Sequence, residues 1–179
     1  GRVAFEKNIE FLLHVAQELK RTTYPDIVLI VAGEGPARDR LQRLGRSLGL
    51  TANLRFVGYL ARGSELSSCY QAGAAFVFAS RTETQGLVLL EAMSLGVPVV
   101  STAVMGTRDI LVAEQGALIA EEDIRDFAAQ VRRLLNDAEL RRRLGEEGRA
   151  YARQWTARSL AETLLAFYRD LQNGQLSAR

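Results

Sequence analysis

Histidine and cysteine are almost absent from this sequence of 179 residues, which holds one of each, His14 and Cys69. A single cysteine excludes a disulfide within the chain and indicates a reducing, cytoplasmic compartment. One histidine and one cysteine cannot build the usual zinc sites, and the sequence contains no Asp-x-Asp pair. We therefore expect no metal ion, a structural role for His14, and a buried, unreactive Cys69.

Long apolar runs and strong charge are missing as well. No run approaches the roughly 20 apolar residues that span a bilayer, and the first residues, GRVAFEKN, do not resemble a signal peptide. A net charge of +2 is too small to indicate nucleic-acid binding. With 47% hydrophobic and 25% charged residues, the composition is typical of one globular domain over residues 1–179.

Helical and strand periods alternate along the chain. Short apolar runs predict buried strands at residues 27–32, 54–57, 74–80, 97–102 and 116–120. Amphipathic segments between them predict helices at residues 8–21, 37–50, 63–73 and 86–95, with a helical turn at 106–112. We expect Asn8 and Ser64 to act as N-caps. Beyond residue 122 the pattern is helical, over 123–137, 138–155 and 157–172.

This order predicts an α/β fold, a doubly wound parallel sheet followed by a helical C-terminal segment. Such sheets bind ligands at the carboxyl ends of their strands, and the loops there are residues 1–7, 33–36, 58–64 and 80–86. The segment 1–7 looks like the loop after a first strand that the sequence lacks. Because that strand would be central, we expect another segment or another molecule to fill its place.

Two carboxylates, Glu83 and Glu91, flank the start of the helix that begins at Gly86. A helix N-terminus attracts anions through its free N–H groups, and glycine allows a ligand to approach the backbone closely. Glu91 lies about 7.5 Å further along the axis. Both carboxylates could flank one ligand that places phosphates on the helix start and hydroxyls on the carboxylates. The alternative is a favourable charge at Glu83 and an ordinary exposed residue at Glu91.

Basic residues form two further groups. Arg2 and Lys7 share the first loop and suit a diphosphate, although solvated surface charges are the simpler alternative. Arg141–Arg143 and their neighbours form either a solvated helix face or a contact with an anionic membrane surface. The GEGP loop that begins at Gly33 contains half of a dinucleotide-binding pattern and is equally well a tight turn.

The segments GRVAFEKN, VAGEGP, LRFVGYL and ETQGLVLLEAMSLGVPVVST occur in the order found in family 4 glycosyltransferases. Over about residues 1–171 the chain resembles their C-terminal, nucleotide-sugar-binding domain, the Rossmann-like half of a two-domain GT-B fold. The resemblance implies transfer of a hexose from a nucleoside diphosphate sugar to an acceptor, with retained anomeric configuration. The donor is a substrate, and we expect no cofactor.

The resemblance also implies roles for three candidate catalytic residues. Arg2 and Lys7 are similar to the pair that holds the donor diphosphate. Glu83 is similar to the carboxylate that contacts hydroxyls of the transferred sugar. It is not expected to act as a nucleophile.

Donor binding is implied for a second set of residues. Gly86 and Leu87 resemble the backbone N–H groups that bind phosphate, and Glu91 resembles the carboxylate that binds the ribose. The other expected donor-binding residues are Gly33, Tyr59 and Leu60, the last two bordering the base. Gln85 replaces a phenylalanine that many relatives carry, a variant similar to transferases that act on lipid acceptors such as diacylglycerol.

The chain begins without a methionine, and the resemblance covers one half of the two-domain fold. We therefore expect a fragment that lacks an N-terminal acceptor domain and is inactive alone. Its partners would be the sugar nucleotide, that domain and, peripherally, the cytoplasmic face of a membrane. Two other functions stay open, a nucleotide-sugar epimerase of the GT-B fold and a binding module without activity. An epimerase would need more acid and base residues than this chain provides.

Overall fold

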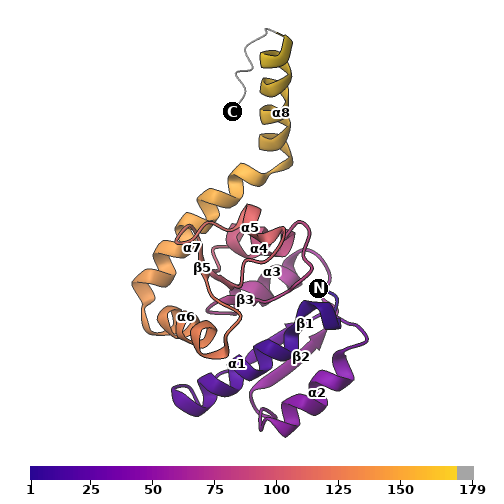
Figure 1. Cartoon of the computed structure of the whole chain (residues 1–179), viewed down its shortest axis with the longest axis vertical. Helices are drawn as coiled ribbons and strands as arrows, with labels where there is room; N and C mark the ends of the chain where they lie inside the picture. Colours follow the sequence, from indigo (N-terminus) through magenta and orange to yellow (C-terminus); the bar gives the residue numbers. More distant parts are fainter. Residues whose placement is uncertain (173–179) are drawn as a thin grey trace.

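The computed structural model describes residues 1–172 (Figure 1). Five short strands alternate with helices, as the sequence predicts. The strands are β1 (Leu29–Ala32), β2 (Leu54–Gly58), β3 (Phe76–Phe78), β4 (Val99–Ser101) and β5 (Ala117–Ile119). The helices are α1 (Ile9–Thr22), α2 (Arg38–Ser47), α3 (Ser64–Gln71), α4 (Leu87–Ser94), α5 (Thr107–Ile110), α6 (Ile124–Asn136), α7 (Ala138–Ala152) and α8 (Ala157–Gln172), with 3₁₀ turns η1 (Phe5–Lys7) and η2 (Arg153–Trp155).

All strand pairs are parallel, but they form two separate sheets, β1–β2 and β3–β4–β5. Among residues 1–172, no strand pairs with the second edge of β1 or with the outer edge of β3. The segment 1–7 joins the carboxyl ends of both sheets. The N-terminal ammonium of Gly1 donates to the Ala32 carbonyl over 2.9 Å, and the Arg81 N–H donates to the Glu6 carbonyl over 3.3 Å.

Helix α1 packs into the cores of both sheets. Its residues Leu12, Val15 and Leu19 join a cluster with β3, β4, β5 and α6. Leu13 and Ala16 join another cluster with β1 and α2. A third cluster lies among α4, β4 and α5. The site loops at the carboxyl ends of the strands are therefore held by buried apolar packing below them.

Like α3, helix α8 has no buried residue. It extends away from the sheets, at the end of the molecule opposite α2 (Figure 1). Its apolar side chains are about half exposed, namely Leu160, Leu164, Leu165, Phe167, Tyr168 and Leu171. Among residues 1–172, no helix is long and apolar enough to cross a membrane, and no cluster of three His, Cys, Asp or Glu residues could hold a metal ion.

Three local predictions need correction. Ser64 is the first residue of α3, and Gly63 precedes it in the cap position with no side-chain cap bond. Asn8 does precede α1, but in the left-handed conformation, and its amide donates to Glu122 over 3.2 Å instead of capping the helix. Cys69 is half-buried and not fully enclosed.

Candidate donor-binding site

The site begins at the N-terminus of α4, where Gly86 occupies the cap position with φ 61°. This left-handed conformation favours glycine. A Cβ at Gly86 would lie 3.2 Å from Leu89 and 3.3 Å from Ile110, so the position is also crowded. The next residue, Leu87, is 56% exposed. Within the part of the chain that the structure describes, the Leu87 N–H has no hydrogen-bond partner, so it is available to an anion.

Lys7 and Glu83 meet at this helix start. The Lys7 ammonium donates to Glu83 Oε2 over 2.8 Å, and the Gly86 N–H donates to Glu83 Oε1 over 3.3 Å. The hydrogen bond from Lys7 lowers the pKa of the Glu83 carboxyl from its ordinary value, with burial acting in the opposite direction. The carboxylate therefore occupies the position where the N-terminus of α4 and a lysine both attract negative charge.

The carboxylate of Glu91 lies on the exposed side of α4 and has one recorded partner among residues 1–172. The Tyr70 hydroxyl donates to Glu91 Oε2 over 3.0 Å. Burial, followed by the negative charge of Glu91, raises the pKa of Tyr70 above its ordinary value, so this hydroxyl keeps its proton. The sequence analysis did not single out Tyr70, because nothing in the sequence shows how α3 and α4 pack.

The other predicted residues lie on loops at the same ends of the strands. Arg2 is exposed and makes no side-chain hydrogen bond or ion pair with residues 1–172. Gly33 donates its N–H to the Gly58 carbonyl over 2.7 Å, and a Cβ there would lie 1.6 Å from the Gly1 carbonyl oxygen. Tyr59 is 76% exposed, and Leu60 is half-buried on the loop after β2.

The loop that leads into α5, to which the sequence analysis gave no role in the site, contacts the backbone of Glu83 and Thr84. Gly106 donates its N–H to the Glu83 carbonyl over 3.0 Å, and a Cβ at Gly106 would lie 2.1 Å from the Thr84 carbonyl oxygen. In the same loop, Ala103 and Met105 have φ values of 48° and 55°. Left-handed backbone at residues other than glycine is uncommon and often occurs at functional sites.

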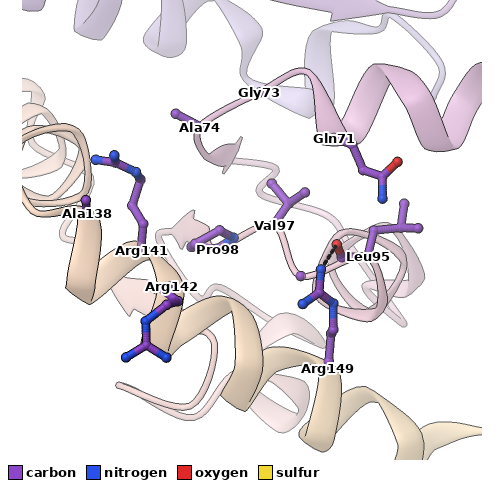
Figure 2. Close-up of a pocket in the computed structure, with 11 residues that line it drawn as sticks. Gln71, Gly73, Ala74, Leu95, Val97, Pro98, Ala138, Arg141, Arg142 and Arg149 are labelled. Carbon is purple, nitrogen blue, oxygen red and sulfur yellow. Dashed lines mark hydrogen bonds between the residues drawn. The ribbon is translucent and has the colours of Figure 1, made fainter.

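A hollow of about 460 Å³ lies elsewhere, beside the amino-terminal end of β4, and its arginines have structural partners (Figure 2). Arg149 points to the end of α4 and donates to the Leu95 carbonyl over 3.1 Å. Arg141 donates to the Leu134 and Leu135 carbonyls near the end of α6. Cations commonly stabilise helix C-termini in this way. We therefore place the candidate site at α4 and not at this hollow.

The family model described as "Glycosyl transferases group 1" matches residues 1–151. The chain belongs to the group 1 glycosyltransferases. It is 37% identical over 153 residues to the sulfoquinovosyl transferase SQD2 of Arabidopsis thaliana, covering 83% of this chain and 28% of that protein. It is 31% identical over 173 residues to the alpha-D-kanosaminyltransferase of Streptomyces kanamyceticus, covering 96% of this chain and 44% of that protein.

Solved structures agree on the architecture of this group 1 glycosyltransferase chain. A mutant of TarM from S. aureus, crystallised with fondaparinux, alpha-GlcNAc-glycerol and UDP, superposes with a TM-score of 0.82 at 26% identity. The match covers 93% of this chain and 34% of that one. The catalytic domain of cholesterol-alpha-glucosyltransferase from Helicobacter pylori gives a TM-score of 0.74 at 25% identity, covering 87% of this chain and 95% of that domain. The chain spans less than half the length of SQD2, of the kanosaminyltransferase and of TarM. The predicted α/β, Rossmann-like GT-B fold is confirmed.

Proposed function

We propose that this chain binds a nucleoside diphosphate sugar, as the donor-binding half of a retaining glycosyltransferase that moves a hexose to a lipid or saccharide acceptor. One observation carries the proposal. Lys7 and the N-terminus of α4 converge on a single negative group, the Glu83 carboxylate. A diphosphate offers negative charge at this position as well, and it would also reach the N–H of Leu87.

The proposed chemistry depends on stabilising charge in the transition state. As the bond between the sugar and the diphosphate breaks, negative charge develops on the departing phosphate oxygens. Lys7, Arg2 and the N–H groups of Gly86 and Leu87 would stabilise that charge, once Lys7 and the Gly86 N–H have exchanged the Glu83 carboxylate for the phosphate. Once a diphosphate engages Lys7, the Glu83 carboxylate is free to accept hydrogen bonds from hydroxyls of the sugar.

The nucleoside would lie beside the diphosphate. In this proposal Glu91 accepts hydrogen bonds from the ribose hydroxyls, while Tyr59 and Leu60 border the base and Gly33 borders the donor from the loop after β1. Glu91 suits that role because it is exposed and its recorded neighbour, Tyr70, leaves one carboxylate oxygen for a ligand. The high exposure of Tyr59 leaves a ring face open for stacking.

A calorimetric panel of UDP-, GDP- and ADP-sugars tests donor binding directly. We expect one base to bind more tightly than the others, with the same affinity in EDTA as without it. No binding by any of the three would refute the proposal, and a strict Mg²⁺ requirement would refute its metal-independent form.

The acceptor site belongs to a second domain in this proposal, so the isolated chain should transfer no sugar. Robust transfer by this chain alone would show that the division into two halves is wrong. In a complete enzyme, the anomeric configuration of the product, read by NMR, tests retention. The same assay distinguishes a transferase from a binding module without activity, because only the transferase forms product.

Location and membrane contact are part of the same proposal. The single cysteine supports a cytoplasmic location. Peripheral membrane contact through α7 stays a prediction. In the structure Arg142 bonds to Glu139 and Glu146, and Arg143 bonds to Glu114 and Glu147, so much of the positive charge on this face is already balanced.

A further inference from the structure

Among residues 1–172, the Glu91 carboxylate accepts one side-chain hydrogen bond. The donor is the Tyr70 hydroxyl, 3.0 Å from Oε2. The two residues belong to different helices, Tyr70 near the end of α3 and Glu91 in the middle of α4. We propose that Tyr70 is a positioning residue that holds Glu91 in the orientation in which it accepts the ribose hydroxyls of the donor. This inference rests on the proposed function of the site.

Tyr70 is itself held firmly. Its ring packs edge-on against Phe76 of β3, with ring centroids 5.3 Å apart, and it packs against the buried cluster among α4, β4 and α5. The carbonyl of Val88 lies 3.5 Å from the same hydroxyl, which is at the limit of a hydrogen bond. The Glu91 carboxylate is therefore the better acceptor by distance and by charge.

Glu91 needs such a partner because its side chain is exposed and has no ion pair among residues 1–172. A free glutamate samples many rotamers, and a ligand that immobilises it loses affinity. One oxygen is fixed by Tyr70, and the other keeps its lone pairs for a ligand. Burial raises the pKa of Tyr70, so its hydroxyl stays protonated and can donate to the Glu91 carboxylate.

The test uses Tyr70→Phe, which removes the hydroxyl and keeps the ring against Phe76. UDP, GDP and ADP are titrated into the wild-type chain by calorimetry, and the tightest binder is taken forward with its 2′,3′-dideoxyribose analogue. We expect Tyr70→Phe to weaken the normal diphosphate about three- to tenfold, the effect of freeing one side chain. We expect no change for the dideoxy analogue, because it has no hydroxyls for Glu91 to accept.

A double-mutant cycle shows whether Tyr70 acts through Glu91. In a Glu91→Gln background, Tyr70→Phe should have little further effect on affinity. Tyr151→Phe is the matched control, because it also removes a half-buried tyrosine hydroxyl, which donates to the Ile110 carbonyl over 2.6 Å. It should leave binding of the diphosphate unchanged while losing comparable thermal stability.

The outcomes separate failure of the positioning role of Tyr70 from failure of the proposed function. Equal weakening of the normal and dideoxy ligands, or additive effects in the cycle, would overturn the positioning role. If Glu91→Gln weakens binding and Tyr70→Phe does not, the inference fails while the proposed function stands. If the wild-type chain binds none of the three diphosphates, the proposed function itself fails and the inference falls with it.

Discussion

Replacing Glu83 by glutamine should affect the nucleoside diphosphate and its sugar conjugate in opposite directions. In the structure this carboxylate competes with any phosphate for Lys7 and for the Gly86 N–H. The Lys7 and Glu83 side chains are 28% and 19% exposed, and an ion pair near the surface contributes at most about 1 kcal/mol. Glu83→Gln should therefore tighten UDP binding about two- to fivefold, since Lys7 no longer has to leave a charged partner.

The sugar conjugate behaves differently because it is proposed to use the carboxylate itself. Hydrogen bonds from sugar hydroxyls to a charged group contribute about 1.5–3 kcal/mol. After subtracting the gain at Lys7, UDP-glucose should bind about five- to thirtyfold more weakly to Glu83→Gln than to the wild-type chain. The ratio of the two dissociation constants should thus rise by one to two orders of magnitude.

Calorimetric titration of both ligands into both chains measures this ratio. If UDP, GDP and ADP differ in affinity, the tightest diphosphate and its glucose conjugate are used instead. Glu139→Gln is the control, since it removes the same charge from an exposed ion pair with Arg142 on α7 and should change neither affinity. Equal weakening of both ligands by Glu83→Gln would refute the assignment of this carboxylate to the sugar.

Three further predictions concern the same elements. Glu91→Gln should weaken diphosphate binding about ten- to hundredfold with a melting temperature close to wild type; unchanged affinity in calorimetry would return Glu91 to an ordinary exposed residue. Because the hydrogen bond from Lys7 lowers the pKa of Glu83 in the fold, the ion pair adds stability above the ordinary pKa and loses it as the pH falls through the lowered pKa, so wild type and Glu83→Gln should differ in urea unfolding at neutral pH and converge as the pH falls below that lowered pKa. Gly145→Ala should lower the free energy of unfolding by about 1–3 kcal/mol, since the added Cβ would lie 2.6 Å from the Gly96 carbonyl oxygen; an unchanged urea midpoint would show that α7 shifts freely.

The fold was predictable because short apolar runs between amphipathic segments indicate parallel strands. The expectation that every strand is buried was wrong for β1 and β2, where Ile30 and Val57 are 40% and 43% exposed. All five strands overlap the predicted segments; four are shorter than their runs, and β2 extends one residue beyond its run, to Gly58. The position of Gly86 at a helix start could also be predicted, since a glycine between a polar loop and an apolar helix commonly marks a helix start. The caps were less predictable: a polar residue near a helix start does not show which residue takes the cap position, as at Ser64, or whether its side chain bonds the helix, as at Asn8.

The contacts of the site were not predictable from sequence spacing. Lys7 and Glu83 are 76 positions apart, and the sequence analysis assigned them to different parts of the donor. Tyr70 and Glu91 are 21 positions apart on separate helices, so their meeting depends on how α3 and α4 pack against β3. Sequence patterns identify the face of a helix, but they do not fix the distance between side chains on two helices.

Helix α1 has a consequence for how the molecule loses its structure. Among residues 1–172 the two sheets share no ladder of backbone hydrogen bonds, so cooperation between them passes through side chains: those of α1 that enter both cores, and Leu29 of β1, which packs against both clusters. Amide exchange in β1–β2 and in β3–β5 can then proceed through separate openings, each with its own free energy. A change at Leu13 would loosen chiefly the β1–β2 unit, while one at Leu12 would loosen the unit that carries α6. The donor loops belong to both units, and a ligand that bridges Lys7 and α4 would couple the two openings more strongly.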